Sequence, residues 1–189
     1  MKTEAKKESL ALYVVRLAVT LLVITAVVAA ALAGVNSITA PAIAALNEAK
    51  TQEAIEAVLP GGGQKIDAPA VSMGVPVAAV YQGENGYAVQ VAPSGFDGEI
   101  DMMVGIDAEG KVVAISIINH TETAGLGAVA AAKTSAGEAF RGQFAGLSGS
   151  AGTEKRGTGT LDAITGATIT SEAVCTGVNA ALAIVAELG

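Results

Sequence analysis

The chain has very few of the residues that most often carry chemistry or covalent cross-links. Its 189 residues include one cysteine, one histidine and no tryptophan, and aromatic residues make up only 3%. The single Cys175 excludes a disulfide within the chain and a thiolate metal cluster, and the single His120 excludes a multi-histidine metal site. Hydrophobic residues nevertheless reach 51%, so the composition is that of a folded chain.

Basic residues are also scarce, and they are unevenly distributed. The chain holds 11 lysines and arginines against 18 aspartates and glutamates, a formal net charge of −7. Four of the basic residues lie in the first 16 positions beside two acidic ones, which leaves 7 basic and 16 acidic residues for the rest of the chain. Because phosphate backbones are bound by basic patches, this acidic body predicts no nucleic-acid partner.

An apolar run near the N-terminus predicts a membrane-spanning helix. No charged residue occurs at positions 17–47, and counting back to Tyr13 gives the roughly 20 apolar residues that a span requires. We expect this transmembrane helix, in contact with membrane lipid, at residues 13–35. The alternative is a cleavable signal peptide with small residues at Ala31 and Ala33, but the apolar region of such a peptide is usually only about 7–15 residues long.

The basic residues predict how this helix is oriented in the membrane. Four lysines or arginines lie at or before Arg16, and the next one, Lys50, follows the apolar run. Cytoplasmic flanks of membrane helices are enriched in lysine and arginine, so residues 1–12 should be cytoplasmic. The main domain should then lie outside the cytoplasm of a bacterial-type cell membrane. A single cysteine, which has no partner to be oxidised within the chain, fits that side.

The rest of the chain predicts a helix followed by a domain of the α+β class. Residues 36–63 read as a linker helix with Thr39 as its N-cap and Pro41 in its first turn, ended by a proline and three glycines. Residues 64–189 then alternate strand and helix patterns, which favours one antiparallel sheet covered by helices.

The expected elements of this domain follow from hydrophobic periodicity and turn residues. Two hairpins predict strands at 77–81, 87–92, 100–106 and 111–119. Helices are expected at 126–145 and 170–188, and a loop rich in glycine and serine at 148–159. Cys175 falls on the last helix, where we expect it to act as a buried small apolar residue.

A glycine–alanine step between two threonines is the first candidate for chemistry. The stretch at 161–171 reads LDAITGATITS and runs into the last helix. Unpaired N–H groups at a helix start favour an anion, Gly166 permits an unusual turn, and the threonine hydroxyls can bond a phosphate oxygen. The residues alone leave two interpretations open, a phosphate site or an ordinary cap by Thr168 or Thr170.

A second glycine-bearing stretch, at 119–127, leaves a strand and enters a helix. It reads NHTETAGLG, so a histidine, a glutamate and two glycines meet at a strand end, where ligand surfaces are common. A solvated turn with a helix cap explains the same residues. Its Gly-x-Gly lacks the third glycine of a dinucleotide-binding fold, and the sequence has no Walker motif, no Gly-x-Ser-x-Gly elbow and no zinc spacing.

Taken together, the two stretches resemble the FMN-binding domain family. Asp162–Thr168 (DAITGAT) is similar to the family's flavinylation motif, Asp-x-x-Ser/Thr-Gly-Ala-Ser/Thr. His120–Gly127 (HTETAGLG) is similar to its His-x-Glu-Thr-Pro-Gly-Leu-Gly stretch, with Ala124 in place of the proline. The Pro93–Gly98 turn and the N-terminal anchor also match in order, so the resemblance covers nearly the whole chain.

By size and layout the chain resembles the G subunits of the Rnf complex, which moves electrons between reduced ferredoxin and NAD and couples this to Na⁺ or H⁺ transport. The resemblance implies a covalent FMN cofactor, moved from FAD by a Mg²⁺-dependent flavin transferase onto the hydroxyl of Thr168 as a phosphodiester. It implies a redox relay whose partners are the other membrane subunits of the complex, with no catalytic residue or metal site of its own.

The resemblance also assigns the residues around the flavin. Glu122 or Thr123 would bond heteroatoms of the ring, two glycines of the second stretch would allow close contact, and Asp162 would be recognised by the transferase. The full set expected at the cofactor is His120, Glu122, Thr123, Gly125, Leu126, Gly127, Asp162, Thr165, Gly166, Ala167 and Thr168.

Other functions are compatible with the same residues. The chain is also similar to the C subunit of the Na⁺-pumping NADH:quinone oxidoreductase, and a stand-alone anchored flavoprotein would share the motifs. An alternative of another class is a non-redox assembly or binding module, which would carry no covalent flavin. An independent hydrolase is disfavoured, because His120 has no evident serine or cysteine partner.

Overall fold

The computed structural model describes residues 2–69, 74–157 and 159–188, and the chain divides into two compact units, 1–47 and 48–189. Helix α1 (Lys2–Val58) contributes to both units and contains Pro41. The predicted N-cap at Thr39 is therefore wrong, and its hydroxyl instead donates to the carbonyl of Val35 (3.1 Å). Pro41 removes one hydrogen bond from the helix. The alanines on both sides of it have a high helix propensity, and α1 continues through this position.

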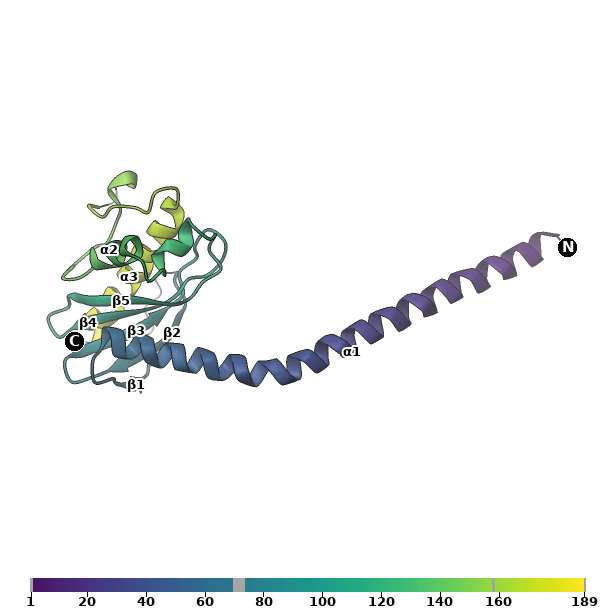
Figure 1. Cartoon of the computed structure of the whole chain (residues 1–189), viewed down its shortest axis with the longest axis horizontal. Helices are drawn as coiled ribbons and strands as arrows, with labels where there is room; N and C mark the ends of the chain where they lie inside the picture. Colours follow the sequence, from purple (N-terminus) through teal and green to yellow (C-terminus); the bar gives the residue numbers. More distant parts are fainter. Residues whose placement is uncertain (1, 70–73, 158, 189) are drawn as a thin grey trace. The chain divides into compact units, whose positions relative to one another are not determined.

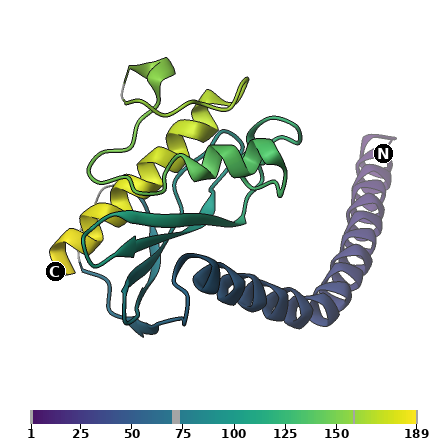
Figure 2. The same cartoon turned by 60° about the vertical axis from the view of Figure 1, so that its left-hand side comes forward.

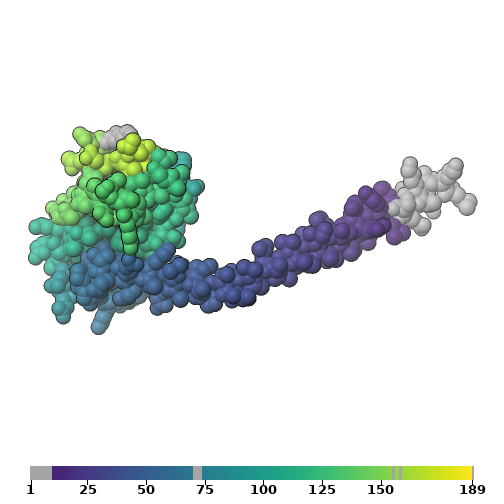
Figure 3. All heavy atoms as spheres, in the orientation of Figure 1, coloured from purple at the N-terminus to yellow at the C-terminus, as the bar shows by residue number. Residues whose placement is uncertain are grey.

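The apolar part of α1 is exposed along its length. Every described side chain between positions 10 and 47 is exposed, as Figure 3 shows for one face. Among the described residues, two helices, α1 and α3 (Thr168–Leu188), are long and apolar enough to cross a membrane. Most of α3 is buried inside the domain, as expected of a core helix, so α1 is the helix that presents its apolar side chains outward.

Five antiparallel strands form the sheet of the second unit, in the order of the sequence (Figure 1). They are β1 (Gln64–Ile66), β2 (Val77–Gln82), β3 (Gly86–Val91), β4 (Asp101–Asp107) and β5 (Val112–Asn119). The four strands expected from the sequence are confirmed to within one residue at each end. The short β1 was missed, because its three residues include only one apolar side chain and show no alternation.

The two faces of the sheet are covered by different helices. On β4, Met102, Val104 and Ile106 belong to a core shared with α3, whereas Met103 packs with the last turns of α1. The central strands are therefore buried on both faces, and α3 and the end of α1 lie on opposite sides of the sheet (Figure 2). The compact unit consequently includes the end of the helix that the sequence assigns to a linker.

The remaining helices depart from the expected boundaries. The predicted helix at 126–145 is two elements, η1 (Gly127–Ala130) and α2 (Ser135–Gly142), because the Thr134 side chain accepts from Gly137 N–H and starts a new helix. The predicted loop at 148–159 contains a short 3₁₀ turn, η2 (Glu154–Arg156), and its position 158 lies outside the described residues. Helix α3 begins two residues before the expected start.

Cys175 lies in the core on α3 and is only 1% exposed. Burial raises the pKa of its thiol to about 12, and the nearby Glu172 carboxylate adds to the effect. The thiol is therefore protonated at neutral pH and is a poor nucleophile. This confirms the sequence-based interpretation of Cys175 as a small apolar core residue.

Gly105 allows the end of α1 to approach the sheet closely. A Cβ at this position would lie 2.3 Å from the carbonyl oxygen of Val58. We expect Gly105→Ala to lower the free energy of unfolding by about 1–3 kcal/mol, measured by urea denaturation of the full chain in detergent. Gly142→Ala is the matched control, since its Cβ would meet nothing within 4 Å, and it should be neutral or stabilising. Equal stability of the two variants would contradict this packing.

Candidate functional site

The two glycine-bearing stretches meet at one cavity of about 330 Å³. A third segment, the turn between β3 and β4, contributes to the same cavity. Its lining consists of Phe96, Glu122, Thr123, Leu126, Gly127, Gly166, Ala167, Thr168, Ile169 and Thr170. Seven of these residues belong to the set expected from the sequence, although the two stretches lie about 40 positions apart in the chain.

The glycine–alanine step forms a tight turn ahead of α3. The carbonyl of Ile164 accepts from Ala167 N–H (2.9 Å), and Gly166 between them has a φ of 79°, as the third position of a type II turn requires. The Ser171 hydroxyl holds the turn against the helix, because it accepts from Ile164 N–H and donates to the carbonyl of Ala167. A side chain at Gly166 would also press on Leu126, whose Cδ2 lies 3.0 Å from the Cβ position.

Helix α3 starts at the cavity without a side-chain cap. Thr168 is its first residue, and the bond from Ser171 N–H to the carbonyl of Ala167 (3.0 Å) is the first of the helical pattern. The N–H groups of residues 168–170 precede that bond, and no side chain among the described residues accepts from them. An uncapped helix start of this kind favours a bound anion. The alternative of an ordinary cap is therefore wrong for both threonines considered.

A buried carboxylate joins two walls of the cavity. Glu122 is 7% exposed, and its Oε1 accepts from the N–H groups of Phe96 (2.8 Å) and Asp97 (3.1 Å). Its Oε2 accepts from the Thr170 hydroxyl on α3. The Thr121 hydroxyl adds a bond to the carbonyl of Asp97 (2.6 Å). Hydrogen bonds to a charged group are about twice as strong as neutral ones, so these contacts fix the turn, the loop and the helix together.

The other expected residues lie elsewhere. Gly125, Asp162 and Thr165 line a separate cavity of about 540 Å³ beside α2. The side chain of Asp162 is exposed, while its backbone pairs with the Gln143 amide (2.7 and 3.2 Å). His120 lines neither cavity, and its Nδ1 is buried without a hydrogen-bond partner among the described residues.

Phe96, Ile169 and Thr170 line the cavity but are absent from the set expected at the cofactor. The sequence position of Phe96 is unusual for an aromatic residue, because it is one of only three phenylalanines and lies in a turn between two glycines. The other two, Phe140 and Phe144, pack edge to face in the core, whereas Phe96 is 67% exposed. An aromatic residue in a polar turn is the pattern that could have identified it.

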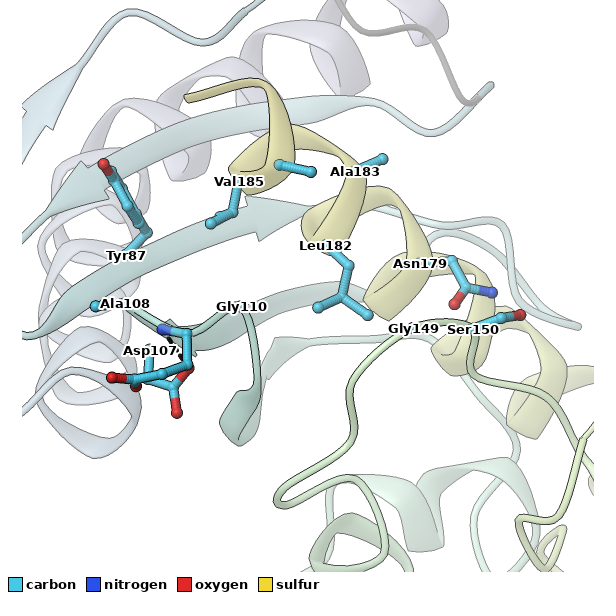
Figure 4. A pocket seen from close by; sticks show the side chains of 12 residues that line it. Tyr87, Asp107, Ala108, Gly110, Gly149, Ser150, Asn179, Leu182, Ala183 and Val185 are labelled. Carbon is cyan, nitrogen blue, oxygen red and sulfur yellow. Dashed lines mark hydrogen bonds between the residues drawn. The ribbon is translucent and has the colours of Figure 1, made fainter. Parts of the chain in front are cut away.

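A larger cavity, of about 640 Å³, lies between the β4–β5 turn and the second half of α3 (Figure 4). Two of its polar side chains are engaged within the protein. The Asp107 carboxylate accepts from the N–H groups of Glu109 and Lys111, and the Asn179 amide pairs with the backbone of Ala151. None of the residues expected at the cofactor lines it, so the smaller cavity is the candidate site.

Comparisons with known proteins match both the part of the chain that contains this cavity and the chain as a whole. Residues 95–183, which include both stretches, match the model of the FMN-binding domain family. The chain is 35% identical to the G subunit of the Na⁺-translocating ferredoxin:NAD⁺ oxidoreductase complex of Acetobacterium woodii, over 100% of this chain and 99% of that protein. It is 30% identical to the G subunit of the ion-translocating oxidoreductase complex of Methanosarcina acetivorans, over 89% of this chain and 93% of that protein.

A shorter match concerns a relative whose complex is named for a different ion. The G subunit of the proton-translocating ferredoxin:NAD⁺ oxidoreductase complex of Clostridium ljungdahlii is 41% identical over 51% of each chain. Similarity therefore extends to a relative from a complex named for Na⁺ and to one from a complex named for protons.

The bond between Thr170 and Glu122 should contribute measurably to stability. Thr170→Val keeps the shape of the side chain and leaves Oε2 of a buried carboxylate without this donor. We expect the free energy of unfolding to fall by about 1–3 kcal/mol in urea denaturation. Thr176→Val on the exposed face of the same helix is the control and should change it little. Indistinguishable variants would argue against the Glu122 contact.

Proposed function

This chain belongs to the family of G subunits of Rnf-type ion-translocating oxidoreductase complexes, and from that premise we propose that it carries FMN covalently on Thr168. An electron-transfer subunit of such a complex needs a redox group, and the FMN-binding domain is the part of the chain that supplies its site. The finer proposal concerns how that group is attached and held.

One observation carries the proposal. Thr168 is the first residue of an uncapped helix and lines the candidate cavity. A phosphodiester on its hydroxyl keeps one negative charge, which the unpaired N–H groups and the helix dipole stabilise. The turn at Gly166 and the absence of a bulky side chain at Ala167 leave the backbone beside this hydroxyl uncrowded, which favours approach by a modifying enzyme.

The attachment is a group transfer that balances without an oxidant. A flavin transferase would present FAD and Mg²⁺, and the Thr168 oxygen would form a bond to the phosphorus of the FMN half. The bond to the AMP half breaks, AMP leaves, and the hydroxyl proton is released. The new bond is to phosphate, so the redox-active ring is not altered by it. Asp162 is exposed and is proposed as a residue that the transferase recognises.

The chain's own contribution is to hold and shield the cofactor. FMN supplies the redox chemistry when bound, and the residues around it set its position. Thr123 is exposed at the cavity and is proposed to bond the ring, with Leu126 and Gly127 in contact with it. His120, Gly125 and Thr165 are proposed to act from farther away, since they do not line this cavity.

The proposed setting is a membrane complex that couples electron transfer between ferredoxin and NAD to Na⁺ or H⁺ transport. We propose that α1 anchors the subunit, with its N-terminus in the cytoplasm and the domain outside. The basic residues at or before Arg16 and the apolar run that follows support this orientation.

The covalent bond is tested by co-expression of the chain with a flavin transferase. After denaturing electrophoresis, we expect a fluorescent band under ultraviolet light and one FMN adduct by intact mass. Thr168→Ala should abolish both, because the acceptor oxygen is removed, whereas the exposed Thr176→Ala on the same helix should retain them.

A dark wild-type band would reject the proposal, provided that the same transferase labels a known substrate in parallel. A band that persists in Thr168→Ala would reject the assigned residue and would leave covalent attachment standing at another site.

The orientation is tested with reporters fused after Gly189. Alkaline phosphatase is active only outside the cytoplasm, so its fusion should be active, and a green fluorescent protein exported in the same way should stay dark. Removing the positive charges of Lys2, Lys6 and Lys7 should weaken this preference. The opposite pattern of reporters would reverse the proposed topology.

A further inference from the structure

Exposed apolar side chains of the domain gather around the candidate cavity. Among the described residues from 48 onward, four large apolar side chains are exposed, namely Phe96 (67%), Ile169 (46%), Leu126 (44%) and Val113 (44%). The first three line the cavity that contains Thr168, and Val113 does not. Leaving apolar area in water is unfavourable, so this collar of Phe96, Leu126 and Ile169 indicates a surface that something covers.

The three side chains of the collar come from different segments of the chain and surround the cavity in which a flavin on Thr168 would lie. Ile169 follows Thr168 on α3, Leu126 lies in the loop after β5, and Phe96 lies in the turn between β3 and β4. A cavity of about 330 Å³ is near the lower end of the range for small-molecule sites, so a flavin would be only partly enclosed. A flavin tethered to Thr168 would bring a flat aromatic ring with an apolar dimethylbenzene side to this collar.

Glu122 holds the backbone at Phe96 through hydrogen bonds, and this role requires no contact between Glu122 and the flavin ring. Its Oε1 binds the backbone N–H groups of Phe96 and Asp97, and its Oε2 is occupied by Thr170. Two glycines make room for this carboxylate on either side. A Cβ at Gly95 would lie 2.3 Å from Oε1, and one at Gly127 would lie 2.3 Å from Oε2.

We propose that Phe96 is a cofactor-contacting residue, the wall against which the isoalloxazine ring lies, and that Glu122 is the positioning residue that holds it there. This rests on the proposed attachment of FMN to Thr168. It gives Glu122 a role different from the ring-bonding one that the sequence suggests, because its oxygens already accept three hydrogen bonds within the protein.

The test uses the full flavinylated chain in detergent and compares wild type with Phe96→Ala, Glu122→Ala, Glu122→Gln and Val113→Ala. Four quantities are measured for each: the fluorescence of the denatured band, the flavin absorption spectrum, the quenching of flavin fluorescence by iodide in the folded protein, and the anisotropy of that fluorescence. The band reports attachment, whereas quenching and anisotropy report whether the ring is shielded and held.

We expect every variant to carry the flavin, since Thr168 is unchanged. Phe96→Ala and Glu122→Ala should raise the iodide quenching constant about twofold or more and lower the anisotropy, because the ring loses its wall. Glu122→Gln should stay near wild type, since a glutamine oxygen can accept from the same two N–H groups. Val113→Ala, an exposed apolar residue away from the cavity, should match wild type.

Several outcomes would overturn the proposal, and they differ from one another. A flavinylated Phe96→Ala protein with wild-type quenching and anisotropy would show that Phe96 is not the wall. A large effect of Glu122→Gln on the flavin absorption spectrum, with wild-type anisotropy, would show that Glu122 contacts the ring directly. A dark wild-type band would refute the attachment itself and this proposal with it. Because Phe96 is largely exposed, its truncation is not expected to prevent folding.

Discussion

The arrangement of the site depends on one buried carboxylate. Glu122 accepts hydrogen bonds from the turn after β3 and from the start of α3, and it belongs to the loop after β5. These three segments are separated by many residues and have no regular secondary structure in common. Burying an ion is unfavourable unless donors surround it, so the loop, the turn and the helix must assemble together around this side chain. The geometry of the cavity is a consequence of that requirement.

The sheet provides the rigid frame on which these contacts are built. Its central strands are covered by α3 on one face and by the end of α1 on the other. The loop and the turn of the site both start from the ends of these strands, and the helix of the site is itself the main cover of the sheet. A cofactor site on such a frame is positioned by core packing, which is stiff, and only its lining is formed by loops.

Sequence reasoning succeeded where a pattern is local. The strands were predicted because apolar residues alternate between turn signals, and the stretch that contains Thr168 was selected because its motif is contiguous. The structure places Thr168 at the candidate cavity, and its flavinylation stays a prediction. The contacts that Glu122 makes with Phe96 and Thr170 could not be found in that way, because they join segments that lie far apart in the sequence. The break between η1 and α2 was missed because the alanine-rich run predicts one continuous helix, whereas Thr134 within it caps a new helix. The close packing of Val58 on Gly105 gave no local pattern either, because the two residues lie far apart in the sequence.

The close approach of Val58 to Gly105 also limits where the chain can be truncated without exposing the core of the domain. Ala54, Ile55, Val58 and Leu59 form a buried cluster with side chains of β3, β4 and β5. A recombinant fragment that begins at the first strand would lack these four residues and would expose the face of the sheet that they cover. Such a fragment would be prone to aggregate for a reason unrelated to the cofactor. A version without the exposed apolar part of α1 should therefore begin near Glu48, where the compact unit starts.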